Sequence, residues 1–308
     1  MTNEAAILAE GLTKHYGEVR ALNDLDLAVK PGEVFGFLGP NGAGKTTAIR
    51  TLMDEIRPTS GRASILGLDT HDKSVEIRRH IGYLPGDLAM YPSLTGKDLL
   101  SYFANLRGGV DWSYVDVLAE RLNADLSKKV GNLSSGNRQK IGLIQAFMNR
   151  PEVIIMDEPS SGLDPLVQRE FQTILRELAA DGKSIFLSSH TLSEVQRVAD
   201  RVGIIRNGDL ITVETVSSLR SKAMRRVEFE FGSDADSTVF ADISGVSNVV
   251  IEGRRIVLSY DGTMDVLLKA AMDHNDTVVD ITTHEADLED IFLTYYEDSS
   301  EGEGRSAL

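Results

Sequence analysis

One stretch near the N-terminus constrains the fold more than any other: the loop GPNGAGKTT at residues 39–47. It follows a short apolar run at 33–38 and precedes a segment at 46–56 with the apolar spacing of a helix. Strand, glycine loop and helix in this order match the pattern G-x-x-x-x-G-K-[ST]. The pattern predicts an α/β core in which backbone N–H groups of the loop and the start of the helix bind a polyphosphate.

The residues of this loop have distinct expected roles. Its glycines let the backbone curl so that N–H groups point inward. Lys45 is expected to reach the β- and γ-phosphates, and the Thr46 hydroxyl is expected to ligate magnesium. Thr47 supports the start of the helix. The residues predicted to bind the nucleotide here are Gly39, Asn41, Gly42, Ala43, Gly44, Lys45, Thr46 and Thr47.

Composition bounds the compartment and the partners. The 308 residues include no cysteine, which excludes disulfides and thiolate metal sites and makes the cytoplasm the default compartment. The first ten residues do not resemble a signal peptide, and no run of about 18 apolar residues occurs, so we expect no membrane span. The net charge of -15 argues against nucleic-acid binding, which requires clustered Lys and Arg.

The acidic charge is concentrated toward the C-terminus. Residues 1–220 carry 28 acidic and 25 basic groups, whereas residues 221–308 carry 19 and 7. This shift predicts a nucleotide-binding domain at 1–219 and a second domain at 220–298, whose alternating strands and single helix indicate a small α+β fold. Residues 299–308 are expected to form a disordered tail.

The nucleotide-binding domain is expected to contain two additions to its parallel core. Apolar and polar residues alternate over the first thirty positions, which predicts antiparallel strands. The region from about 95 to 150 is predicted to be a helical insertion between two core strands. Tyr16 precedes a glycine turn, where its ring could stack on a base or simply pack against neighbouring residues.

Three further positions carry candidate chemistry. Ser134 and Gly136 stand where a helix begins, so they could contact a phosphate or only cap the helix. A fully apolar strand ends in Asp157 and Glu158; we expect Asp157 to bind magnesium directly or through water, and Glu158 to orient or deprotonate an attacking water. His190 follows another buried strand and either joins this edge or is a surface histidine.

Together these residues resemble the ATP-binding subunit of an ABC transporter over about residues 5–215. The most specific match is Leu-Ser-x-Gly ahead of the acidic strand, since kinases and small GTPases lack it. The matches, in order, are Tyr16 to the adenine-stacking aromatic, 39–47 to Walker A, 133–137 to the family signature, 153–158 to Walker B, 161–164 to the D-loop and His190 to the switch histidine.

The resemblance implies an ATP hydrolase with a P-loop NTPase core that uses ATP and Mg²⁺, with Glu158, His190 and Lys45 as catalytic residues. It also implies a head-to-tail pair of cassettes, either two copies or one copy and a paralogue. Ser134 and Gly136 of one cassette would contact the γ-phosphate held by the other. The pair would drive separate permease subunits from the cytoplasmic face of the membrane. Residues 288–293 are similar to those of drug- and sodium-exporting cassettes.

The chain departs from the family pattern at the Q-loop. The family usually has a magnesium-contacting glutamine after Tyr83-Leu84-Pro85, whereas this chain has Gly86 followed by Asp87. Either Asp87 becomes the metal ligand after a local backbone shift, or water takes the place of the missing amide.

A different class of function remains an alternative, namely a soluble cassette protein acting on ribosomes or nucleic acid. Such a protein would usually need two cassettes in one chain, a long coiled-coil insertion or a basic arm, and the sequence has none of these. A non-hydrolysing nucleotide switch is disfavoured because Lys45, Asp157, Glu158 and His190 are all present.

Overall fold

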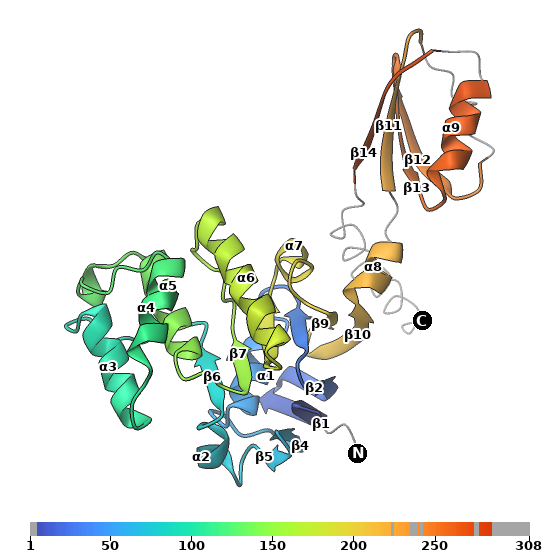
Figure 1. Cartoon of the computed structure of the whole chain (residues 1–308). Helices are drawn as coiled ribbons and strands as arrows, with labels where there is room; N and C mark the ends of the chain where they lie inside the picture. Colours follow the sequence, from blue (N-terminus) through green and yellow to red (C-terminus); the bar gives the residue numbers. More distant parts are fainter. Residues whose placement is uncertain (1–4, 223–224, 235–238, 241–242, 274–276, 285–308) are drawn as a thin grey trace. The chain divides into compact units, whose positions relative to one another are not determined.

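The protein is described here by a computed structural model covering residues 5–222, 225–234, 239–240, 243–273 and 277–284. The chain divides into two compact units, residues 1–216 and 217–308 (Figure 1). This division falls three residues before the predicted boundary at 219. Within the described residues, no helix is both long and apolar enough to cross a bilayer.

The first unit is built on a six-stranded sheet with the order β10-β9-β3-β8-β7-β6. Its inner strands β3, β7 and β8 are buried along their whole length, as their apolar sequences predicted. Five strands run parallel and β10 closes one edge in an antiparallel hairpin with β9. The strands are β3 (Val34–Leu38), β6 (Ile81–Leu84), β7 (Val153–Met156), β8 (Ser184–Ser189), β9 (Arg201–Arg206) and β10 (Asp209–Thr215).

Helices α1 (Lys45–Leu52), α6 (Pro165–Ala180) and α7 (Leu192–Val195) follow the carboxyl ends of β3, β7 and β8. Helix α1 is shorter than the predicted 46–56. It ends because Asp54 takes a positive φ of 53°, a left-handed conformation typical of helix ends.

A second, antiparallel sheet has the order β2-β1-β4-β5. Its strands are β1 (Ile7–Tyr16), β2 (Val19–Val29), β4 (Ser60–Ile65) and β5 (Leu68–Asp69), and the short helix α2 (Ser74–Ile77) follows. The predicted antiparallel strands are therefore confirmed. The buried side chains of this sheet share one apolar core with α1 and the six-stranded sheet.

The helical insertion lies between β6 and β7, as predicted, and is drawn in green in Figure 1. It consists of α3 (Gly96–Leu106), α4 (Trp112–Arg121), a 3₁₀ turn η1 (Val130–Asn132) and α5 (Ser135–Phe147). Thr95 begins α3 in a reciprocal capping box with Asp98. Helix α5 is largely buried and packs beside β6, so it fixes the insertion to the core.

Helix α8 (Val216–Lys222) contains the division between the units, and the second unit contains a four-stranded antiparallel sheet of order β12-β13-β11-β14. Its strands are β11 (Arg225–Phe231), β12 (Val246–Glu252), β13 (Arg255–Tyr260) and β14 (Val278–His284). Helix α9 (Met264–Asp273) connects β13 to β14, which flank β11, in a split βαβ arrangement. The predicted α+β fold is thus observed, whereas residues 288–293 and the predicted tail at 299–308 lie outside the described residues.

Candidate active site

The loop at residues 39–47 joins β3 to α1, and close backbone approaches require two of its glycines. A Cβ on Gly39 would lie 2.4 Å from the carbonyl oxygen of Ile205. Gly44 has a φ of 110°, and a Cβ there would lie 2.4 Å from the carbonyl oxygen of Ala21. The loop therefore turns tightly into α1, and Asn41, Gly42 and Thr46 remain exposed at the helix N-terminus.

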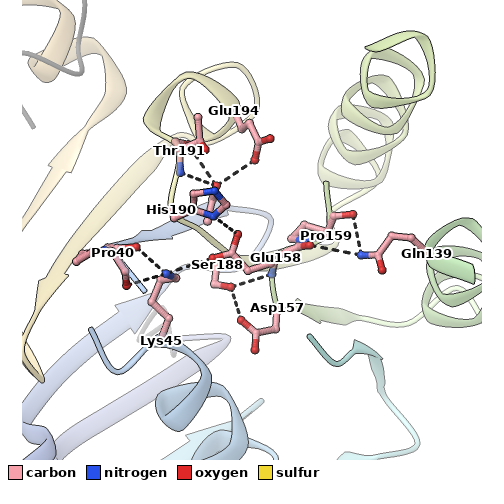
Figure 2. A network of polar contacts seen from close by, with 12 residues as sticks. Pro40, Lys45, Gln139, Asp157, Glu158, Pro159, Ser188, His190, Thr191 and Glu194 are labelled. Carbon is pink, nitrogen blue, oxygen red and sulfur yellow. Dashed lines mark hydrogen bonds and ion pairs between the residues drawn. The ribbon is translucent and has the colours of Figure 1, made fainter. Parts of the chain in front are cut away.

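Lys45, Glu158 and His190 meet at this loop (Figure 2). The Lys45 ammonium donates to the carbonyl oxygens of Gly39 at 2.6 Å and Pro40 at 3.1 Å, and lies 3.2 Å from Glu158 Oε1. His190 Nδ1 lies 2.8 Å from Glu158 Oε2. Three residues predicted from separate parts of the sequence thus form one connected group, with Glu158 between the lysine and the histidine.

Asp157 lies beneath this group and is only 2% exposed. The Ser188 hydroxyl donates to Asp157 Oδ1 at 2.5 Å and accepts from the Glu158 backbone N–H at 2.9 Å. Ser188 therefore fixes the two carboxylate-bearing residues relative to each other. Glu158 itself has a φ of 50°, a left-handed conformation that costs roughly 1–3 kcal/mol in a residue with a side chain.

The oxygen donors near the phosphate loop suit magnesium. A threonine hydroxyl and a carboxylate are hard ligands, and Mg²⁺ is commonly held by one or two carboxylates together with substrate phosphates. In the described part of the chain no group of three His, Cys, Asp or Glu residues could hold a metal alone. Thr46 and Asp157 therefore fit a magnesium ion that the substrate also binds.

The Q-loop follows β6 and places Gly86 against Asp157. A Cβ on Gly86 would lie 2.9 Å from Asp157 Oδ2, while Asp87 occupies the next, exposed position. Burial raises the pKa of Tyr83 above its ordinary value, and the nearby carboxylates of Glu55 and Asp157 raise the pKa further. The Tyr83 phenol, near the carboxyl end of β6, therefore stays neutral. The role of Asp87 as a magnesium ligand remains a prediction.

Tyr16 ends β1 and is 48% exposed. The Lys14 ammonium lies 5.1 Å from the centroid of its ring, within the range of a cation–π contact. The ring therefore presents an accessible face, as stacking on a base requires.

The signature residues lie at the start of α5. Ser134 is its N-cap and accepts from the Asn137 backbone N–H at 3.3 Å. Gly136 lies so close to the D-loop that a Cβ on it would be 2.2 Å from the carbonyl oxygen of Gly162. The capping role considered for Ser134 is observed, and its exposed hydroxyl is also available at a helix N-terminus.

The D-loop ends at Asp164, which caps α6. Backbone hydrogen bonds from Val167 and Leu166, together with the charge of Lys140, hold the pKa of the Asp164 carboxyl below its usual range, with the Val167 bond the largest contribution. The carboxylate is therefore ionised and fixed at the helix start.

Two residues near the catalytic group had no predicted role. Ser188 was recognisable only as a small polar residue at the end of a buried strand. Gln139, which donates to the Pro159 carbonyl, carried a clearer signal, because it lies one and two turns before the buried Leu143 and Phe147 on one face of α5. A polar residue on a buried helical face needs a hydrogen-bond partner.

The family model for ABC transporters matches residues 22–161 of the chain. The bacitracin transport ATP-binding protein BcrA of Bacillus licheniformis is 35% identical over 289 residues, which cover 92% of this chain and 94% of that protein. A probable multidrug ABC transporter ATP-binding protein, YbhF of Escherichia coli K12, is 34% identical over 225 residues, covering 71% of this chain and 39% of YbhF.

Solved structures agree with these sequence relatives. An ATP-binding subunit of an ABC transporter is 30% identical, with a TM-score of 0.64 over 70% of this chain and 92% of that one. The dimeric structure of MJ0796, a bacterial ABC transporter cassette, shares the fold with a TM-score of 0.63 at 24% identity, over 68% of this chain and 98% of that one. The chain belongs to the ABC transporter family, as an ATP-binding subunit that hydrolyses ATP.

Proposed function

We propose that two copies of this chain pair head to tail and hydrolyse Mg–ATP at two shared sites, which drives a separate membrane permease. The observation that carries this proposal is the convergence of Lys45, Glu158 and His190 on the phosphate loop. A cation for phosphate, a carboxylate for water and an imidazole beside that carboxylate are the parts that phosphoryl transfer to water needs.

Each side chain then has a defined task. Lys45 and the loop N–H groups bind the β- and γ-phosphates, and the Tyr16 ring stacks on the adenine. Glu158 orients the attacking water and accepts its proton, while His190, 2.8 Å away, holds the carboxylate in place. Thr46 and Asp157 would hold magnesium, which would neutralise charge on the phosphates when bound.

The second copy supplies the remaining contacts. Ser134 and Gly136 lie at a helix N-terminus, which attracts anions. In the described part of the chain, neither residue is hydrogen-bonded to Lys45 of the same copy. We assign them to the γ-phosphate bound by the partner. MJ0796, whose fold this chain shares, has been solved as a dimer.

A complementation experiment tests the two-copy site. Lys45→Ala removes the phosphate lysine, and Ser134→Asp keeps a good N-cap but places a carboxylate against the phosphate. Each full-length variant alone is expected to lose ATP hydrolysis. A mixed dimer contains one doubly damaged site and one intact site, so mixing should restore measurable hydrolysis. No restoration at any mixing ratio would contradict the shared site.

The helical insertion offers a surface for the permease. Tyr91 and Tyr102 are 53% and 43% exposed, with ring centroids 5.7 Å apart, and Phe103 adds a third ring 5.5 Å from Tyr102. Exposed aromatic clusters are enriched at protein interfaces. Tyr91 follows the Q-loop by only a few residues, so we place the permease contact here.

Co-purification tests this contact. Replacing Tyr91 and Tyr102 with serine is expected to release the chain from membranes that contain its permease, while ATP binding is retained. The matched control is Tyr114→Ser. Tyr114 is on α4, another helix of the insertion, and its ring makes a cation–π contact with Arg150. Membrane retention of the double variant would exclude this surface.

We further propose export as the direction, because relatives include bacitracin and probable multidrug transport proteins. The chain would act at the cytoplasmic face of the membrane, bound to its permease. The net charge of -15 does not favour the alternative function on ribosomes or nucleic acid.

A further inference from the structure

We propose that Gln139 is a positioning residue for Glu158, and that the start of α5 holds residues 158–164 in the conformation that hydrolysis requires. The inference rests on the proposed function, in which Glu158 activates water. It assigns a role in the hydrolysis reaction to a residue that contacts neither phosphate nor metal. We call residues 158–164 the acidic loop.

Gln139 is only 8% exposed and points its amide at the backbone of the acidic loop. Its Nε2 donates to the carbonyl oxygen of Pro159 at 3.0 Å and lies 3.4 Å from the carbonyl oxygen of Glu158 (Figure 2). The Ser161 backbone N–H also donates to the Glu158 carbonyl, at 3.2 Å. The backbone on the carboxyl side of the catalytic residue is thus bonded to α5.

Glu158 needs such support because its backbone is left-handed, with a φ of 50°. A conformation of this kind persists only when the surroundings fix it from several sides. Ser188 holds the Glu158 N–H, Gln139 holds its C=O, and Lys45 and His190 hold its carboxylate. Without Gln139 the carbonyls of Glu158 and Pro159 lose their hydrogen bonds to α5, so the acidic loop is held less firmly and the Glu158 carboxylate is positioned less precisely.

The same helix contacts the acidic loop at two further points. Gly136 abuts the carbonyl of Gly162, where a Cβ would be 2.2 Å away. Lys140 is 7% exposed; its ammonium donates to the Asn123 carbonyl at 3.2 Å and lies 3.7 Å from Asp164 Oδ2. Contacts at the beginning, middle and end of the loop make α5 and the acidic loop one mechanical unit.

This unit joins two ATP sites within one chain. Ser134 and Gly136, at the tip of α5, are proposed to contact the ATP held by the partner. Gln139, one turn later, holds the carboxylate that acts on the chain's own ATP. A shift of α5 on engaging the partner's phosphate is therefore transmitted to Glu158 through the Gln139 hydrogen bonds.

Substitutions of Gln139 in the full-length chain test the proposal. Gln139→Met keeps the size but removes the donor, and Gln139→Glu places an acceptor against two carbonyl oxygens. At pH 8 both are expected to lower kcat by about tenfold to a hundredfold, the range for a displaced catalytic group, with KM for ATP within about twofold. Gln145→Met makes the same change at a half-buried site further along α5 and should leave kcat unchanged.

The Gln139→Glu variant carries an internal control. Once protonated, its carboxyl can again donate to the Pro159 carbonyl, and the buried, carbonyl-rich surroundings favour the neutral form. The ratio of its kcat to that of the wild type is therefore expected to rise as the pH falls from 8 to 6. Gln139→Met has no titrating group and should show a constant ratio.

Hydrogen exchange of the full-length chain without nucleotide supplies a readout independent of hydrolysis. Peptides covering 158–164 should exchange faster in Gln139→Met than in wild type or Gln145→Met. Unchanged kcat, or a loss of activity with unchanged exchange in this loop, would overturn the positioning role. If wild type hydrolysed no ATP but Gln139→Met still increased exchange in 158–164, Gln139 would be shown to hold the acidic loop. The proposed function would then be refuted.

Discussion

At the scale of single residues, two Glu–His pairs lie at opposite ends of β7 in the described part of the chain. Glu158 pairs with His190 at the carboxyl end, and Glu152 pairs with His80 at the other, each at 2.8 Å. Only Glu158 also contacts the buried Lys45. We therefore expect the chemistry to depend on the position of the pair beside the phosphate loop and not on the pair itself.

Glu158→Gln is expected to abolish turnover while ATP binding is retained, because the amide keeps the shape but cannot accept a proton. The expected loss in kcat is about 100-fold to 10,000-fold. ATP-loaded dimers should accumulate and can be detected by analytical ultracentrifugation. Glu152→Gln breaks the matched pair far from the loop and should hydrolyse ATP normally. Turnover by Glu158→Gln within about threefold of wild type would refute the role of Glu158.

Asp87→Ala tests the departure at the Q-loop. If Asp87 is a magnesium ligand, the variant should lose magnesium-dependent hydrolysis by roughly tenfold to a thousandfold, with binding of metal-free nucleotide unchanged. A magnesium titration of ATPase activity makes this measurement. Asp116→Ala, at an exposed position on α4, is the control. An unchanged magnesium dependence would show that water fills the place of the missing glutamine.

At the scale of elements, Arg121 connects the helical insertion to the core. It donates from α4 to Glu170 and Glu177 on α6, with both contacts to Glu177 made by its terminal nitrogens. The side chain of Arg121 is 28% exposed. The hydrogen bond from Arg121 holds the pKa of the Glu177 carboxyl below its ordinary value.

Arg121→Met is expected to lower the stability of the first unit by about 0.5–1 kcal/mol, a modest value because solvent screens these pairs. A carboxylate with a lowered folded-state pKa stabilises the fold above its unfolded pKa, near 4.5, and loses that effect as the pH falls through the folded pKa. Urea midpoints of wild type and variant should therefore differ at pH 7 and converge only once the pH has fallen well below 4.5, through the lowered folded-state pKa. A difference independent of pH would contradict an ionic origin.

The sequence predicted most elements because their periodicity was local. The apolar strands, the glycine loop and the helical insertion each followed from their own residues. The predicted end of α1 was too far along the chain because Asp54 adopts a left-handed conformation. Aspartate tolerates this conformation but does not require it, so the sequence alone does not indicate it. The contacts of Gln139 and Ser188 were not predicted, since they depend on which strand ends and helices the topology brings together.

At the scale of the whole molecule, the two compact units differ in charge as well as in fold. Residues 1–216 carry 28 acidic and 24 basic groups, a net of -4, and residues 217–308 carry 19 and 8, a net of -11, so most of the excess negative charge lies in the second unit. Each unit has its own apolar core within the described residues. The phosphate loop, the acidic loop and His190 all lie in the first unit, so we predict that nucleotide binding does not depend on the second.

Residues 1–219 alone are accordingly expected to fold and bind ATP. Ending the chain after Leu219 retains the two buried apolar side chains at the start of α8, Val216 and Leu219, which are 7% and 1% exposed. Circular dichroism and ATP binding by fluorescence titration check this, with the same truncation carrying Lys45→Ala as the control for specific binding. A soluble truncated chain should bind ATP within about threefold of the full-length affinity, because the loop that binds phosphate is intact. An insoluble product unable to bind nucleotide would show that the first unit depends on the second for its fold.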